Sequence, residues 1–340
     1  MLKRFNENKI IKNILENSKL KTDSKYPANL DIIKGIGDDA AYWKDDKFAY
    51  CTSTDSLVEN VHFKLNYFTP TELGKKSIAV NLSDIAAMGA TPLGMLISLG
   101  ITKSQDEEWI NEFYKGVFEL SESYNSPVLG GDLVYSSNLF ISITCFGYRE
   151  LKINGNKDVF MDRSKLQEDD LLYVTGYLGD SKAGLEILNS DLDLNVESTH
   201  HKELIRNHIY KSPRVEAGLK LLNNGVKNCI DISDGLLIDA KRLASASKVD
   251  INIIEDSLPI SNSLKLVFPD DYKKYALIGG EDYELLFSAP KSKKDILVNI
   301  FANLNVNLSV IGEICKGEGE IFVDGNLSEI TGWDHFDFVL

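Results

Sequence analysis

Acidic residues that follow short turns and apolar runs are the most informative feature of this sequence. Asp38 and Asp39 come directly after a glycine-flanked turn at residues 35–37. Further along, Asp55 follows an apolar, β-rich run, behind Ser53 and Thr54. Carboxylate and hydroxyl oxygens are the ligands that Mg²⁺ prefers in proteins. This stretch therefore has the residue types that one part of a magnesium site requires.

Three more segments carry aspartates in similar places, namely NLSDIAAMG with Asp84, VLGGD with Asp132, and IDISDGL with Asp231 and Asp234. A single aspartate of this kind usually caps a helix or stabilises a turn. If all these segments converge, repulsion between the carboxylates forces protonation or unfolding unless divalent cations are present. The pattern therefore predicts a site with several Mg²⁺ ions, whose natural chemistry is phosphoryl transfer. Zinc is disfavoured because no His or Cys cluster accompanies the acids.

The sequence excludes several familiar nucleotide-binding and catalytic motifs. It contains no P-loop, no protein-kinase motif set and no G-x-S-x-G nucleophile elbow. GIGDDA at residues 35–40 fits the G-x-G-x-x-A dinucleotide pattern. However, it leads into a turn and a strand instead of a helix, and Asp38 and Asp39 would repel a pyrophosphate. A user of ATP must therefore hold its nucleotide in another way.

Length and composition describe an acidic, two-domain globular protein. The chain has 340 residues and a formal net charge of −14, which argues against a nucleic-acid partner. We expect an N-terminal domain at 1–150 and a C-terminal domain at 151–340, separated by the hydrophilic segment 149–158. No apolar run is long enough to cross a membrane, and the four scattered cysteines indicate reduced thiols. We expect a cytoplasmic protein with a mature N-terminus that forms an amphipathic helix.

The acids need helices and strands to position them. The spacing predicts a helix from Thr69 to Gly89, in which Asp84 lies beside a buried stripe of Ile78, Leu82 and Ile85. A strand at 93–101, a helix at 106–124, a tight turn at 128–132 and a strand at 139–148 follow. In the second half we expect a strand at 171–176 and a strand-to-helix corner at 231–234. Residues 279–282 precede another strand, and 319–326 form a hairpin.

Eight segments in order along nearly the whole chain resemble the thiamine-monophosphate kinase family, of the aminoimidazole ribonucleotide synthetase and selenophosphate synthetase superfamily. They are GIGDDAA, STDSLVENVHF, AVNLSDIAAMGATP, GGD, VTGYLGDSKAGL, IDISDGL, GGEDYEL and GWDHF. The resemblance implies that ATP phosphorylates thiamine monophosphate to thiamine diphosphate by direct in-line transfer, without a covalent nucleophile on the enzyme. It also implies a two-domain α+β fold. In this fold the N-terminal domain forms a β-barrel-like homodimer interface with ATP nearby, and the C-terminal domain is an α/β sandwich.

The same resemblance implies a role for individual residues. Several Mg²⁺ ions would be held by Asp39, Ser53, Thr54, Asp55, Asp84, Asp132, Asp231 and Asp234, with Asp38 in support. ATP would contact Tyr114, Gly131, Asp132, Arg163 and Ser233. Thiamine monophosphate would contact His62, Glu281 and Trp333.

Elementary chemistry agrees with several of these roles, and some alternatives stay open. The Arg163 guanidinium suits a phosphate oxygen, and an aromatic face such as Trp333 can stack on a cationic thiazolium, with Glu281 as a negative partner for it or for the aminopyrimidine. Taken alone, His62 fits a strand end bonded to backbone, and Trp333 fits a core residue. A sister synthetase that activates an amide or selenide is one rival function, although no catalytic cysteine lies near the N-terminus. A non-catalytic nucleotide-binding scaffold is another, but it would have lost several of the acids.

Overall fold

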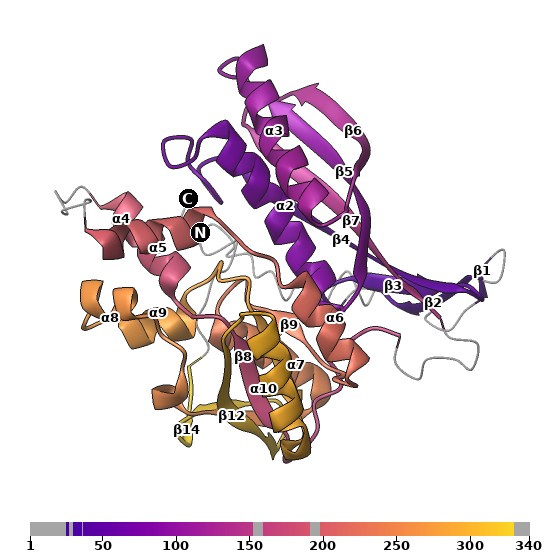
Figure 1. The fold of residues 1–340 in the computed structure, drawn as a ribbon, viewed down its shortest axis with the longest axis vertical. Helices are drawn as coiled ribbons and strands as arrows, with labels where there is room; N and C mark the ends of the chain where they lie inside the picture. Colours follow the sequence, from indigo (N-terminus) through magenta and orange to yellow (C-terminus); the bar gives the residue numbers. More distant parts are fainter. Residues whose placement is uncertain (1–24, 27–29, 36, 152–158, 191–197, 330–340) are drawn as a thin grey trace, which may run out of the picture.

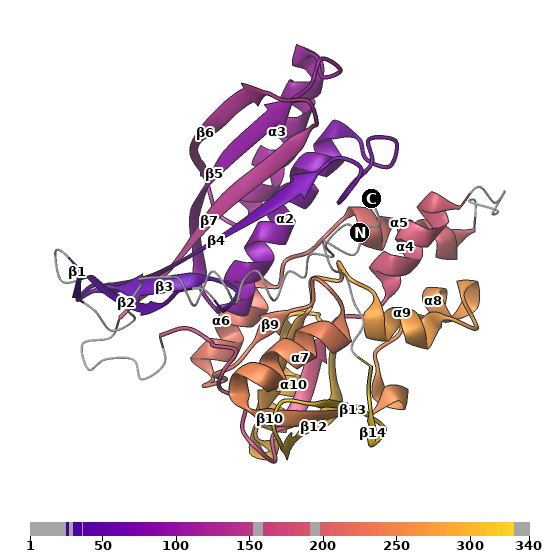
Figure 2. The same cartoon turned by 180° about the vertical axis from the view of Figure 1, so that it is seen from behind.

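The protein has two lobes, each built on a seven-stranded mixed sheet, in a computed structural model that describes residues 25–26, 30–35, 37–151, 159–190 and 198–329 (Figures 1 and 2). The N-terminal part of the chain forms the upper lobe of Figure 1, and the part after residue 159 forms most of the lower lobe. Mixed sheets with separate helices make this an α+β fold. In the described parts of the chain, no helix combines the length and apolarity needed to cross a membrane.

The first sheet is antiparallel except at one edge. Its strand order is β1-β2-β3-β4-β7-β5-β6, and only β5 and β6 run parallel. The strands are β1 (Lys25–Tyr26), β2 (Leu30–Lys34), β3 (Ala41–Lys44), β4 (Phe48–Val58), β5 (Thr91–Ile101), β6 (Val128–Tyr135) and β7 (Phe140–Glu150). Strand β4 continues through Ser53, Thr54 and Asp55, so these residues belong to the strand and do not follow its end.

The second sheet has the order β14-β13-β10-β12-β8-β11-β9 and one parallel pair, β10 with β13. Its strands are β8 (Leu171–Thr175), β9 (Ile230–Asp231), β10 (Val249–Ile253), β11 (Leu285–Ala289), β12 (Leu308–Lys316), β13 (Ile321–Val323) and β14 (Asn326–Leu327). The helices around it are α4 (Asp180–Asn189), α5 (Thr199–Ile209), α6 (Val215–Asn223), α7 (Leu236–Ser247), α8 (Asn262–Val267), α9 (Tyr272–Ile278) and α10 (Lys294–Asn303). Two 3₁₀ turns, η2 (Glu255–Ser257) and η3 (Lys291–Lys293), complete this lobe.

Helix α2 (Pro70–Ala87) is the central helix of the molecule. It begins at a complete capping box, in which the Thr69 side chain accepts from the amide of Glu72 and the Glu72 side chain accepts from the amide of Thr69. The predicted stripe of Ile78, Leu82 and Ile85 is fully buried. Helix α3 (Glu107–Ser123) packs beside α2, and both cover one face of the first sheet (Figure 1).

A continuous apolar core joins the two lobes. One cluster of buried side chains runs from the first sheet and α2 through α6 to Phe287 of β11 and Phe301 of α10. Helices α2 and α6 approach so closely that a Cβ at Gly218 would lie 2.0 Å from the carbonyl oxygen of Ala86. Glycine is therefore required at this crossing, and the two lobes are held at a fixed distance along α2.

The turn predicted at 128–132 was wrong, because these residues belong to strand β6. The two glycines serve strand packing: a Cβ at Gly131 would lie 1.8 Å from the carbonyl oxygen of Ile97, and the β5–β6 register shifts at Met95 and Leu96. Glycine in a strand often marks such a bulge or close backbone approach. A Gly-Gly pair was misread as a turn because both features use the same residue.

Most other expected elements are confirmed within one or two residues, including the helix that begins after Thr69, the helix that begins after Asp106 and the hairpin at Asp324 and Gly325. The described residues do not include the expected N-terminal helix, positions 152–158 of the expected boundary segment 149–158, or Trp333. The domain boundary at residue 150 stays a prediction.

Candidate active site

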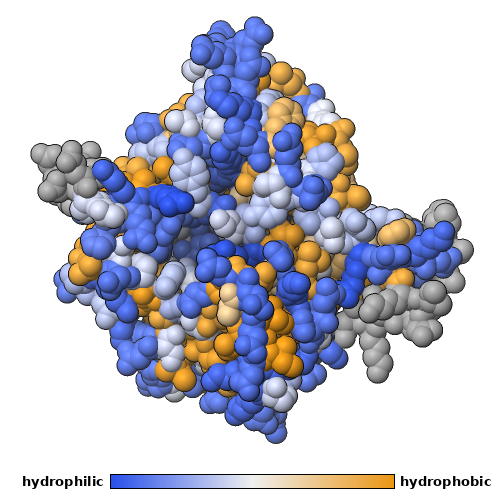
Figure 3. Space-filling view, in the orientation of Figure 1, coloured by the Kyte–Doolittle hydropathy of each residue, from blue (hydrophilic) through white to orange (hydrophobic). Residues whose placement is uncertain are grey.

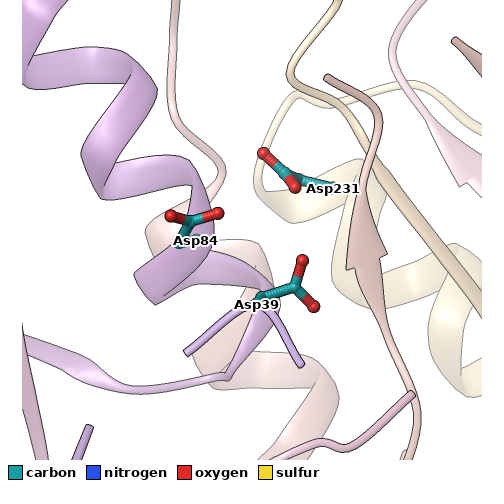
Figure 4. A group of neighbouring side chains, drawn as sticks. All are labelled: Asp39, Asp84 and Asp231. Atoms are coloured by element: carbon teal, nitrogen blue, oxygen red, sulfur yellow. The ribbon is translucent and has the colours of Figure 1, made fainter. Parts of the chain in front are cut away.

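Three aspartates from distant parts of the chain meet between the two lobes. Figure 4 shows Asp39, Asp84 and Asp231 with their carboxylates turned toward one another. One oxygen atom from each side chain lies within 4.8 Å of the others. Asp39 precedes β3, Asp84 lies in the last turn of α2, and Asp231 ends β9. The first sheet, the central helix and the second sheet thus each supply one carboxylate.

Hydroxyl groups fix two of these carboxylates. The Ser53 hydroxyl on β4 donates to Asp84 Oδ2 at 2.5 Å, and the Ser83 hydroxyl on α2 donates to Asp231 Oδ2 at 2.6 Å. Two adjacent residues of α2 therefore contact both sheets: Ser83 bonds to Asp231 of the second sheet, and Asp84 bonds to Ser53 of the first. Sequence reasoning overlooked Ser83, whose only signal was its place next to an aspartate in a helix with few charged residues.

The cluster holds more negative charge than its surroundings compensate. Burial raises the pKa of Asp84 well above its usual range, and the charge of Asp55 adds to this effect. Burial also raises the pKa of Asp231, with Asp39 as the second cause. A carboxylate whose pKa rises in this way is short of a positive partner.

Arg163 supplies part of the missing positive charge. Its Nε donates to Asp39 Oδ2 at 3.1 Å and its Nη2 to Asp39 Oδ1 at 2.5 Å, which is a bidentate pair. Asp38 faces Lys34, with 3.3 Å between Nζ and Oδ2, and accepts a hydrogen bond from the amide of Arg163. Burial, followed by the charge of Asp39, nevertheless raises the pKa of Asp38 to about 7. Asp38 thus contacts the backbone of Arg163, whose side chain pairs with Asp39, and this gives it a supporting role.

The loop that carries Ser233 and Asp234 is held by a residue that sequence reasoning missed. Asp239 Oδ2 accepts hydrogen bonds of 3.1 Å from the amides of Ser233, Asp234 and Gly235. Arg242 Nη1 lies 2.6 Å from Asp234 Oδ2 and donates to Asp239 Oδ1 at 2.6 Å. These contacts hold in place Ser233, a predicted ATP contact, and Asp234, a predicted metal ligand, in the loop that follows Asp231. Asp239 resembles any first-turn helix acid in the sequence, so nothing in the pattern pointed to it.

The remaining predicted metal ligands lie on two faces of the first sheet. Residues that are paired across neighbouring strands lie on the same face of a sheet, and successive residues of one strand alternate between its two faces. Asp55 pairs with the buried Ile143 and its amide donates to Asn81 of α2, so it lies on the helix-covered face near Asp84. Thr54 pairs with Thr144 on the open face.

Asp132 belongs to the open face as well. Asp132 on β6 pairs with Ser98 on β5, and Ser98 pairs with Ser142 on β7. Asp132 is exposed, as is most of strand β6. Three strand spacings, roughly 14 Å, separate β6 from β4. Within one chain the structure therefore does not bring Asp132 to the group of Asp39, Asp84 and Asp231. Gly131 lies next to it on β6, and Tyr114 packs beside Phe118 on α3.

The predicted substrate residues occupy different surroundings. His62 Nδ1 accepts the amide proton of Val58 at 3.0 Å, which puts the proton of a neutral imidazole on Nε2. Glu281 precedes β11, and its Oε1 lies 2.9 Å from the ammonium of Lys76. Its amide donates to the carbonyl of Ser233 at 2.7 Å, so Glu281 lies directly on the loop of Ser233 and Asp234.

The donor set of the cluster fits a hard divalent cation. Asp39, Asp84 and Asp231 offer oxygen atoms only, and within the described parts of the chain no His or Cys belongs to this group. Mg²⁺ takes oxygen ligands and is usually shared between carboxylates and substrate phosphates. The uncompensated negative charge indicates the same kind of occupant.

Two family models match the chain. The AIR synthase related protein N-terminal domain matches residues 37–148, and the corresponding C-terminal domain matches residues 167–325. Curated relatives cover nearly the same length. The chain is 36% identical over 312 residues to the thiamine-monophosphate kinase of Aquifex aeolicus, across 89% of this chain and 93% of the relative. It is 34% identical to the Bacillus subtilis enzyme of the same name, with the same two coverages.

A solved structure gives the same result in three dimensions. The complex described as AaThiL with AMPPCP and TMP superposes with a TM-score of 0.83 at 34% identity, covering 98% of both chains. Identity above 30% across about nine tenths of the chain, together with the shared two-lobe fold, shows that this chain belongs to the thiamine-monophosphate kinase family.

Proposed function

We propose that this protein transfers the terminal phosphoryl group of ATP to thiamine monophosphate, giving thiamine diphosphate and ADP. An oxygen of the acceptor phosphate forms the new bond to the γ-phosphorus, and the bond from that phosphorus to the β–γ bridging oxygen breaks. Both substrates carry phosphate groups, so such an enzyme must concentrate negative charge in one place. The convergence of Asp39, Asp84 and Asp231 carries the proposal, because it provides for cations that phosphates can share.

Mg²⁺ is the metal that we propose for this cluster. Asp39, Asp84 and Asp231 would hold it. We keep Ser53, Asp55 and Asp234 as ligands of further ions, because Ser53 bonds to Asp84, the amide of Asp55 bonds to Asn81 on the same helix, and Asp234 follows Asp231 by three residues. When bound, Mg²⁺ neutralises phosphate charge and polarises the phosphoryl oxygens. Transfer of this type asks the protein mainly for positioning and charge stabilisation. No side chain needs to act as a covalent nucleophile.

The residues around the cluster position the nucleotide. We assign Arg163 to a phosphate oxygen of ATP because a guanidinium forms two parallel hydrogen bonds as readily to phosphate as it does here to Asp39. Ser233 lies in a loop whose amides are fixed by Asp239. The three hydrogen bonds to Asp239 restrain this loop, and a fixed geometry is the usual condition for precise transfer.

The acceptor would lie on the side of Glu281. Because this carboxylate is already paired with Lys76, we assign it to a hydrogen bond with the aminopyrimidine and not to the thiazolium charge. We keep His62, whose Nδ1 accepts from the amide of Val58, as a proposed contact of thiamine monophosphate. Trp333 remains our proposed stacking partner for a heteroaromatic ring.

A homodimer would complete the nucleotide side of the site. Strand β6 is an edge strand, and Leu129, Leu133 and Tyr135 on it are 58%, 54% and 69% exposed. Apolar residues gather at the upper right of Figure 3, where β5 and β6 lie in Figure 1. An exposed edge strand is a ready template for pairing with another chain. We propose that two such edges pair into a barrel-like interface that brings Asp132, Gly131 and Tyr114 to ATP.

We also propose a cytoplasmic location without a membrane partner, and the net charge of −14 argues against a nucleic-acid partner. One assay tests the proposed reaction directly. Purified protein is incubated with ATP, Mg²⁺ and thiamine monophosphate, and the products are separated by chromatography. Thiamine diphosphate and ADP are expected in equal amounts and only with Mg²⁺ present. Absence of thiamine diphosphate at high enzyme concentration would disprove the proposal.

A further inference from the structure

Lys76 on helix α2 is a buried cation with an unusual environment. Its side chain is fully buried, whereas its neighbour Lys75 is 31% exposed and pairs with Glu119 on α3. Burial of an ammonium group is costly unless a carboxylate compensates it. Here the compensating group is Glu281 at 2.9 Å, and the ring of Phe68 lies 5.0 Å from Nζ.

Glu281 is held in an unfavourable backbone conformation. The backbone angle φ is +63° at Glu281 and +53° at Tyr283, two residues later. Residues other than glycine rarely adopt this left-handed region. Such conformations persist where surrounding contacts over-determine them, and they concentrate at functional sites. The contacts here are the hydrogen bond from the Glu281 amide to Ser233 and that from the Tyr283 amide to Ile232. These two bonds hold the backbone, and the ion pair with Lys76 holds the side chain of Glu281.

The carboxylate of Glu281 is 25% exposed, so one side of it is accessible while the other faces cations. Burial by itself raises the pKa of this carboxyl, but the charge of Lys76, followed by His208 and Lys211, outweighs burial and lowers it to about 2. His208 Nδ1 lies farther away, at 3.5 Å from Oε2, and burial lowers its pKa well below the usual value. Burial and the charge of Lys76 lower the pKa of Lys211 to about 7. Lys76 is therefore the dominant partner.

Helix α2 connects this ion pair to the acid cluster. Lys76 precedes Asp84 by eight residues on one helix, which corresponds to roughly 12 Å along the axis. Asp84 points to the metal cluster, and Ser83 beside it holds Asp231. A single rigid helix thus sets the distance between the place of phosphoryl transfer and Glu281.

We propose that Lys76 is a positioning residue that holds the Glu281 carboxylate toward the acceptor substrate at a fixed distance from the acid cluster. This inference rests on the proposed kinase function and deepens it. Lys76 itself touches no substrate and acts through Glu281. Its loss should therefore affect thiamine monophosphate and leave ATP binding intact.

The test compares Lys76→Met with Lys75→Met, two substitutions at neighbouring positions of the same helix. In Lys76→Met, KM for thiamine monophosphate should rise at least about tenfold while KM for ATP changes less than about twofold, because one charge-assisted contact is lost on the acceptor side. Lys75→Met should leave both constants unchanged. Equal increases in both KM values, or an unchanged acceptor KM in Lys76→Met, would overturn the inference.

A second pair of variants covers the case in which Lys76→Met fails to fold. Glu281→Gln combined with Lys76→Met removes both charges of the buried pair, so neither is left without the other and this double variant should fold. If Lys76 acts through Glu281, the double variant should have the same acceptor KM as Glu281→Gln alone. A further increase on adding Lys76→Met would assign Lys76 an independent role and overturn the inference. A wild-type protein without kinase activity would instead refute the proposed function.

Discussion

The hydroxyl of Ser83 on helix α2 donates a hydrogen bond of 2.6 Å to Asp231, the last residue of strand β9. This bond joins the central helix to the second sheet at the point where the acidic residues converge. Its neighbour Asp84 faces the first sheet through Ser53. Two adjacent residues of one helix therefore hold both halves of the candidate metal site together.

Replacing Ser83 tests this junction. Ser83→Ala should lower the free energy of unfolding by about 1–3 kcal/mol, since it removes a buried hydrogen bond to a carboxyl group. It should also reduce kcat, because Asp231 loses its fixed orientation. Ser77→Ala is the matched control, because Ser77 is equally buried on α2 but donates only to the carbonyl of Gly74 in its own helix. Urea unfolding and steady-state kinetics measure both effects, and equal kinetic losses in the two variants would contradict the assignment.

The acids of the cluster should matter for turnover and not for folding. Asp84→Asn and Asp231→Asn should each reduce kcat at least about a hundredfold, because a metal ligand is lost. Without metal their melting temperatures should match or exceed that of the wild type, since each substitution relieves repulsion between buried carboxylates. Asp270→Asn, at an exposed turn, is the control. Wild-type rates in both cluster variants would leave these residues with a structural role only.

Without metal, stability should fall as pH rises from about 5 to about 6.5. Burial and neighbouring carboxylates raise the pKa values of Asp38, Asp84 and Asp231 in the folded protein, so it keeps protons that the unfolded chain has already released. Stability therefore decreases with pH in this window. The lowered pKa of His208 acts in the opposite direction, but the raised pKa values of Asp239 and Asp282 add to the effect of the three aspartates.

Mg²⁺ should reduce this dependence because a bound cation takes the place of the protons. Urea midpoints measured across the window, with EDTA and with Mg²⁺, check the prediction. Stability that increases with pH in the presence of EDTA would show that the acids are compensated by other groups.

The exposed edge of the first sheet should hold the dimer. Replacing Leu129 and Leu133 together by Lys should produce a monomer in sedimentation velocity, since two charges would have to be buried at the interface. Leu266→Lys is the control, because Leu266 is 60% exposed on α8 in the other lobe. A wild-type monomer, or a dimer that survives the double substitution, would refute the interface at β6.

Local patterns predicted the secondary structure well where a cap or a periodicity was present. The capping box at Thr69 and the stripe of Ile78, Leu82 and Ile85 placed α2 correctly. The Gly-Gly pair at 130–131 misled because close strand approach and tight turns require the same residue. Sequence alone indicates which residues are bulky or small, but not which backbone will pass beside them.

The site was predicted in part for a similar reason. Turn context identified Asp39 and Asp231, and a half-buried helix face identified Asp84; the fold does bring these three together. Ser83, Asp239 and Lys76 were missed, since each acts through a contact with a residue from another segment or loop. The opposite faces of Asp55 and Asp132 depend on strand register, which spacing along the chain does not reveal.

Anomalous scattering from Mn²⁺ would examine the shared metal site directly. Crystals grown with Mn²⁺ and a non-hydrolysable ATP analogue should give a peak between Asp39, Asp84 and Asp231, at roughly 2.1 Å from their carboxylate oxygens and in contact with the nucleotide phosphates. If the nucleotide is bound and no peak lies near these three residues, the proposed role of the acid cluster in phosphoryl transfer is wrong.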